Sequence, residues 1–304
     1  MPAIISHYLL AERVYCALKD LRPQLKINHT AFVWGASGPD VLFCHSMFPF
    51  QKKRSLREYG TKMHNEPADV LLNYLVSYAG ITRDDIAMSY ALGFVTHYAF
   101  DSLAHPFVLY FSEQMAYRQK GKHESVCHNE IETNLDSLFL RMERKEKISR
   151  FRLSDAAPLD RRVNKGIAKA LQGYFLYHYD KRVFESDFVQ AQKDWHRGLA
   201  LLNDRTGIKY RFVRSCENAL GISPLGSTLF RRDYPDLQND YANMKHKQWF
   251  SAVDGLEHTE SFFDIADKAE DFSVELIADI LSGKQLTSQQ CKYKFSGKGE
   301  NDKN

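Results

Sequence analysis

The chain has 304 residues, a length that allows one large domain or two of ordinary size. Charged residues make up 26% and hydrophobic residues 44%, a balance typical of globular proteins that excludes the disordered and fibrous classes. The formal net charge is only +3, and Lys and Arg are mixed with acids along the chain, so there is no strong case for nucleic acid as a partner.

The cysteine content and the N-terminal residues bear on the cellular compartment, and both favour the cytoplasm. The five cysteines are odd in number and form no CxxC pair, which favours a reducing environment over a disulfide framework or a cysteine zinc site. The first residues, MPAIISHYLL, lack the basic region of a signal peptide, and no stretch reaches about eighteen uncharged apolar residues. We therefore expect a cytoplasmic protein without a transmembrane segment.

The hydrophobic pattern is helical nearly throughout and shows no convincing strand alternation, so we predict an all-α fold. Helices are expected over residues 4–20 and about 56–79, with a break at Pro67. Between them, WGASGPD at 34–40 is expected to be a loop, because two glycines and a proline interrupt the chain.

A longer helix is expected from a cap at Thr82 to about Pro106, because a hydroxyl followed by acids is typical of a helix start. Another is expected from near His123 to Arg144. Further helices are predicted over residues 164–180, 185–202, 206–219 and 261–283. Residues 145–163 are a candidate weak junction, and residues 286–304 are expected to be a polar, disordered tail, which leaves 1–285 as a single helical domain.

The segment THYAFDSLAHP carries polar groups inside an apolar helix. His97, Asp101 and His105 are four residues apart, so they share one stripe of the helix. Burying such groups is costly unless something binds them. The ordinary alternative is a hydrogen-bonded core histidine or a surface ion pair.

The next helix repeats this pattern, which weakens the ordinary alternative. His128 and Glu132 are again four residues apart, with Asp136 one turn beyond. Helical bundles build metal sites from such stripes on facing helices, and imidazole with carboxylate suits Zn²⁺, Fe²⁺ or Mn²⁺. Four histidines lack such neighbours and are expected to be ordinary structural residues: His178, His196, His246 and His258.

The succession ISHYLL, WGASGPD, YGTKMH, THYAFDSLAHP and HNEIETNLD resembles the zinc-dependent phospholipase C family, and NMKHKQW at 243–249 looks like a further family feature. The resemblance implies a multi-helix bundle, shared in outline with S1/P1-type nucleases, around a buried cluster of two or three zinc ions. By position it implies these metal ligands: His7, Asp40, His64, His97, Asp101, His105, His128 and Glu132. It implies two catalytic carboxylates, Asp101 shared between ions and Asp40 accepting a proton from the attacking water.

Residues near the ligand segments are candidates for supporting roles. His45 and His123 are close enough in sequence to be hydrogen-bond partners of the ligands. Four aromatic residues are candidates for lining a lipid-facing cleft, although a helical core contains such residues equally often: Phe48, Phe50, Tyr110 and Phe111.

The leading hypothesis is a zinc-dependent phosphoric-ester hydrolase that cleaves a phospholipid to diacylglycerol and a phosphorylated head group, with peripheral membrane contact. Two alternatives stay open. A single-strand nuclease or nucleotidase of the S1/P1 type predicts a basic groove with stacking platforms. A non-catalytic metal-binding or scaffold protein predicts that protein groups fill every coordination position.

Overall fold

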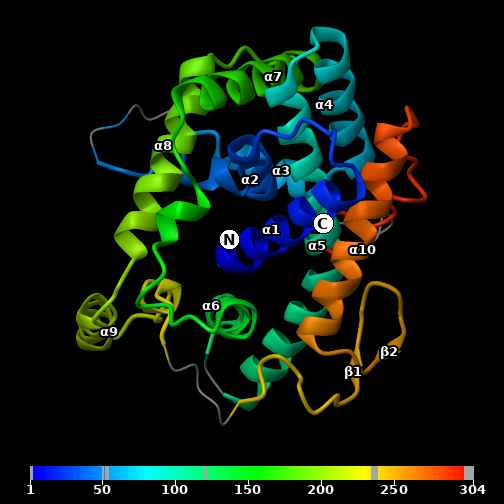
Figure 1. Cartoon of the computed structure of the whole chain (residues 1–304). Helices are drawn as coiled ribbons and strands as arrows, with labels where there is room; N and C mark the ends of the chain where they lie inside the picture. Colours follow the sequence, from blue (N-terminus) through cyan, green and yellow to red (C-terminus); the bar gives the residue numbers. More distant parts are fainter. Residues whose placement is uncertain (1–2, 50, 52–54, 120–121, 234–238, 298–304) are drawn as a thin grey trace.

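The computed structural model describes residues 3–49, 51, 55–119, 122–233 and 239–297, and within them the fold is all-α, as predicted (Figure 1). The α-helices are α1 (Ile4–Leu21), α2 (His29–Ala36), α3 (Arg57–Asn65), α4 (Ala68–Thr82), α5 (Asp85–Arg118), α6 (Glu124–Arg144), α7 (Arg161–Tyr179), α8 (Glu185–Leu202), α9 (Ile208–Leu220) and α10 (Phe262–Leu281). Short 3₁₀ helices are η1 (Gly38–Cys44), η2 (Leu153–Ala156) and η3 (Ser227–Leu229). The strands β1 (Trp249–Phe250) and β2 (Glu257–His258) form a small antiparallel hairpin.

The long central helix α5 differs from its predicted bounds at both ends. Its cap is Asp84, whose carboxylate accepts hydrogen bonds from the amides of Ile86 and Ala87 at 2.8 and 3.2 Å, whereas Thr82 ends α4. The helix also continues past Pro106 to Arg118, so the predicted end is wrong. A proline removes one helical hydrogen bond, but α5 is packed against other helices on both sides of this position, and that packing offsets the loss.

The predicted break at Pro67 is confirmed. Pro67 is the N-cap residue of α4, and the chain before it forms the separate helix α3. The predicted loop at 34–40 is wrong in part, because its first three residues complete α2 and its last three begin η1, with only Ser37 as a turn between them.

Two glycines let α2 and α5 cross in backbone contact. A Cβ atom on Gly35 would lie 2.2 Å from the carbonyl oxygen of Tyr90, and one on Gly93 would lie 2.0 Å from that of Phe32. No larger residue fits at either position. This close crossing brings η1, which follows α2 directly, against the middle of α5.

One continuous core includes the segment predicted to be a weak junction. Phe151 and Leu153 are buried in it, and the indole nitrogen of Trp34 donates a hydrogen bond of 2.8 Å to the carbonyl oxygen of Pro158. Residues 145–163 therefore tie α6 and α7 to the same core. Among the described helices, none combines the length and the apolar character needed to cross a membrane.

The expectation of a disordered tail is wrong for residues 286–297. Leu286, Cys291 and Phe295 are buried, and Leu286 exchanges two backbone hydrogen bonds of 2.8 and 2.9 Å with the side chain of Asn73 on α4. The amide of Ser296 donates to the carbonyl oxygen of His64 at 3.1 Å. The domain therefore extends beyond residue 285, and residues 298–304 lie outside the described chain.

Candidate metal centre

A cavity of about 260 Å³ is lined by residues of α1, η1, α3, α5 and α6. Seven of the eight predicted ligands line it: His7, Asp40, His64, Asp101, His105, His128 and Glu132. The eighth, His97, is fully buried and stacks on the ring of His7 with 4.5 Å between ring centroids. Segments far apart in the sequence thus bring all eight side chains together.

Asp101 lies between the histidines of three elements. Its Oδ1 atom is 3.0 Å from His7 Nε2, and its Oδ2 atom is 3.2 Å from His97 Nε2 and 3.9 Å from His64 Nε2. Burial alone would raise the pKa of Asp101, but the imidazoles of His105, His97 and His7 hold it well below its ordinary value. The group is therefore a carboxylate whose two oxygens face different imidazoles.

A second group consists of His105, His128 and Glu132, whose ligand atoms lie within 4.8 Å of one another. His128 Nε2 is 3.2 Å from Glu132 Oε2. Burial would raise the pKa of Glu132, but His128 is the main neighbour that lowers it to about 2. Burial also lowers the pKa of His105, so this group combines a neutral imidazole with a carboxylate.

Asp40 and His64 form a third contact, with 3.1 Å between Asp40 Oδ1 and His64 Nε2. Asp40 reaches this position because Gly38 precedes it with φ of +50°, a conformation that favours glycine. A Cβ atom on Gly38 would also lie 2.1 Å from the His97 ring. Gly38 is thus needed both for the turn and for the close approach of η1 to α5.

Backbone carbonyls fix the orientation of three of the rings. The Nδ1 atoms of His64, His97 and His105 donate to the carbonyl oxygens of Gly60, Ala36 and Phe295 at 2.7, 3.1 and 2.6 Å. Because a carbonyl oxygen only accepts, Nδ1 carries the proton and Nε2 keeps its lone pair. Metal-ligating histidines are typically held in this way.

The donor set fits zinc. His7 Nδ1, His97 Nε2 and Glu132 Oε2 are buried and make no hydrogen bond within the described residues, although the last two lie 3.2 Å from Asp101 Oδ2 and His128 Nε2. Each such atom costs about 1–3 kcal/mol, a penalty that a bound cation removes. Imidazole nitrogens and carboxylate oxygens without thiolates are typical ligands of catalytic zinc sites.

A family model described as zinc dependent phospholipase C matches residues 6–181, more than half of the chain. The chain belongs to the zinc-dependent phospholipase C family. No curated protein and no solved structure gives a significant match. The matched segment contains all eight predicted ligands, so family and geometry together support a zinc-binding, phospholipase C-like hydrolase.

The two histidines expected to support the phospholipase C site have other contacts. His45 Nδ1 accepts a hydrogen bond of 3.0 Å from the amide of Leu56, the residue before α3, so it bears on His64 only through the start of that helix. His123 is exposed and caps α6 by accepting from the amide of Ser125. The prediction for His123 is therefore wrong.

Asp136 belongs to a buried ion pair and not to the group of metal ligands that α6 supplies, His128 and Glu132. Its Oδ2 atom is 2.7 Å from a guanidinium nitrogen of Arg231, and its Oδ1 atom accepts from the amide and hydroxyl of Ser6 at 2.7 and 2.8 Å. Because Ser6 precedes His7, this carboxylate fixes the start of α1 and the position of the ligand. Sequence reasoning missed the role because Arg231 is 95 residues away.

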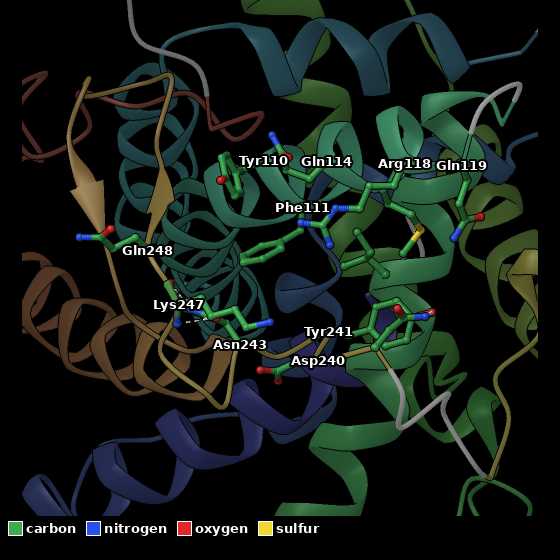
Figure 2. Close-up of a pocket in the computed structure, with 13 residues that line it drawn as sticks. Tyr110, Phe111, Gln114, Arg118, Gln119, Asp240, Tyr241, Asn243, Lys247 and Gln248 are labelled. Atoms are coloured by element: carbon green, nitrogen blue, oxygen red, sulfur yellow. Dashed lines mark hydrogen bonds between the residues drawn. The ribbon is translucent and has the colours of Figure 1, made fainter.

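The aromatic residues Tyr110 and Phe111 line a different pocket of about 170 Å³, together with Arg118 and Lys247 (Figure 2). Asn243, Lys247 and Gln248 of the NMKHKQW segment also line it. Among the other aromatic candidates, Phe48 is half-buried and Phe50 lies outside the described residues.

Proposed function

We propose that the protein hydrolyses a phospholipid on the glycerol side of the phosphate, which releases diacylglycerol and a phosphorylated head group. The observation that supports this most directly is that seven imidazole and carboxylate side chains line one cavity, with His97 stacked on His7 beside it, in a member of the phospholipase C family.

Two groups of three ligand residues favour two zinc positions, and a further pair of residues would supply a third. His7, His97 and Asp101 would hold one ion, and His105, His128 and Glu132 a second. Asp40 and His64 would hold a third, with Asp101 as the nearest further carboxylate. When bound, zinc supplies Lewis-acid chemistry that neutralises phosphate charge and makes water acidic near neutral pH.

The protein's own groups would bind the substrate and move its protons. Water adds its oxygen to phosphorus, the bond from phosphorus to the glycerol oxygen breaks, and the glycerol oxygen takes up a proton. Asp40 would accept the proton that the water loses, because it lies beside the cavity and is ionised. Burial would raise its pKa, but the imidazoles of His64 and His97 help to hold that pKa below its ordinary value. The apolar side chains of Phe43 and Leu109 on the cavity wall would contact the glycerol side of the lipid.

The alternatives receive less support. A nuclease site predicts cations and stacking platforms beside the metals, whereas the described residues that line this cavity include no Lys or Arg. A purely structural metal site predicts that protein groups fill every coordination position of the metal, whereas about 260 Å³ of space remains among the ligands.

The proposal is tested by measuring zinc content and then release of phosphocholine and diacylglycerol from phosphatidylcholine, beside bis-p-nitrophenyl phosphate and single-stranded DNA. We expect lipid turnover in the wild type and a loss of at least about 100-fold in Asp101→Asn, because the amide keeps the shape but not the charge. Asp267→Asn, at an exposed carboxylate on α10, is the matched control. Nucleotide release without lipid turnover, or full activity in Asp101→Asn, would refute the proposal.

A further inference from the structure

Helix α9 lies at the edge of the molecule, and its main packing partner is the short helix η3 (Figure 1). Its inner face carries the residues that are buried or half-buried: Tyr210, Val213, Arg214 and Glu217. Its outer face exposes large apolar side chains, with Ile208 60%, Phe212 69% and Leu220 71% exposed. Most amphipathic helices of globular proteins turn such residues towards the core.

The exposed apolar side chains form one stripe. Ile208, Phe212, Cys216 and Leu220 follow one another at intervals of four residues and are all exposed. Positions four apart lie about 40° apart around a helix, so the four side chains occupy one side of α9. Ile222 and Leu225, exposed in the turn that follows, extend the apolar surface.

Cations accompany the stripe. Arg205, Lys209 and Arg211 lie on or just before α9 and are exposed, and within the described chain none of them forms an ion pair. The acids of this segment face backbone amides: Asp204 accepts from the amide of Tyr210 at 2.8 Å, and Glu217 from those of Gly226 and Ser227 at 2.7 and 3.0 Å. The outer side of α9 is therefore apolar along its length, with three exposed cations in and just before its N-terminal part.

We propose that α9 docks the protein on an anionic phospholipid surface, with its apolar stripe in the interface and its cations against lipid phosphates. Interfacial helices combine an apolar face with Lys and Arg in this way, and each cation near an anionic membrane strengthens binding about fivefold. A second copy of the chain is a poorer occupant, because pairing two such faces brings like charges together. The choice of a phospholipid surface rests on the proposed function, whereas docking itself requires no turnover.

Two exposed cysteines allow a direct test. Cys216 lies in the stripe, Cys16 lies on α1, and Cys44, Cys127 and Cys291 are buried. A polarity-sensitive thiol label is attached to Cys216 in Cys16→Ser, or to Cys16 in Cys216→Ser. With phosphatidylcholine vesicles containing about 30% phosphatidylserine, we expect a blue shift of the label on Cys216 and none of the label on Cys16, and a smaller shift at high salt.

Sedimentation with the same vesicles measures the contribution of single residues. Phe212→Asp should weaken binding about tenfold or more, since it places a charge where the docked helix would bury an aromatic ring in lipid. Arg205→Gln should weaken binding about fivefold. Ile81→Asp, at a residue of α4 that is 84% exposed, is the matched control and should leave binding unchanged.

The outcomes separate docking from catalysis. Absence of vesicle binding by the wild type, or an equal loss in Ile81→Asp, overturns the docking proposal. Self-association that Phe212→Asp abolishes, without vesicle binding, overturns it in favour of an interface between copies. Vesicle binding without lipid turnover leaves docking intact and counts against the proposed function alone.

Discussion

The Nδ1 atom of His105 donates a hydrogen bond of 2.6 Å to the carbonyl oxygen of Phe295, 190 residues further along the chain. The ring of Phe295 is fully buried and packs edge-on against His64. Gly297, two residues later, lies so close to α5 that a Cβ atom would be 2.7 Å from that of His105. The C-terminal segment thus forms one wall of the metal centre.

Two truncated chains, one without this wall and one that keeps it, should differ in stability and in zinc affinity. A chain that ends at Lys284 loses the acceptor of His105 and the buried Phe295, and should lose about 3 kcal/mol or more of unfolding free energy and about 10–100-fold in zinc affinity. A chain that ends at Gly297 should match the wild type. Thermal unfolding and zinc titration check both, and equal zinc affinity in the two truncations would contradict the role of this segment.

Gly38→Ala should disturb the centre from a position that binds no metal. The added methyl group meets the His97 ring and imposes a side chain at positive φ, so we expect a loss of about 2 kcal/mol and weaker zinc binding. Gly80→Ala, in α4 with open space around it, should instead stabilise the protein by about 0.5–1 kcal/mol. Urea unfolding compares the two, and a neutral Gly38→Ala would show that η1 and α5 are not tightly coupled.

Asp136→Ala should be strongly destabilising, because it leaves the guanidinium of Arg231 buried without its carboxylate and releases Ser6. We expect a loss of about 3–5 kcal/mol. Asp267→Ala removes an exposed partner of Arg13 and should cost less than about 1 kcal/mol. Denaturant titration measures both, and similar losses would mean that the Asp136 pair contributes no more than a surface contact.

Acidification should remove the zinc ions one after the other. The pKa of Glu132 is lowered to about 2, so this carboxylate stays ionised far below neutral pH and protons compete for the imidazoles first. Burial would lower the pKa of His97, but Asp101 beside it raises that pKa above its ordinary value, whereas burial lowers the pKa of His105. The group of His97 should therefore release its ion at a higher pH than the group of His105.

Zinc content after dialysis between about pH 8 and 5 tests this order. The wild type should show two steps, and His128→Ala should retain only the step at higher pH. Simultaneous loss of all zinc in the wild type would contradict the assignment of two separate groups.

The sequence predicted the parts of the site that depend on local spacing. His97, Asp101 and His105 are four residues apart on α5, and His128 and Glu132 on α6, so helix geometry alone places each set on one stripe. The convergence of the two stripes with His7, Asp40 and His64 came from the family resemblance, because no local pattern specifies such a contact.

The errors share a physical cause, which is tertiary contact overriding local composition. The two glycines and the proline of WGASGPD predict a loop by composition, whereas Gly35 is helical and required for contact with α5. Residues from Leu286 onwards are polar on average, yet three apolar side chains among them reach the core. The spacing of Asp136 from Glu132 is that of a further metal ligand on α6, and only its distant partner Arg231 reveals its structural role.

Anomalous scattering at the zinc absorption edge, measured from crystals of the purified protein, tests the central claim most directly. We expect peaks inside the cavity, one within reach of His7, His97 and Asp101 and another within reach of His105, His128 and Glu132. A zinc-replete protein with no peak among these side chains, or with its peaks elsewhere, would contradict the assignment of this cavity as the metal centre.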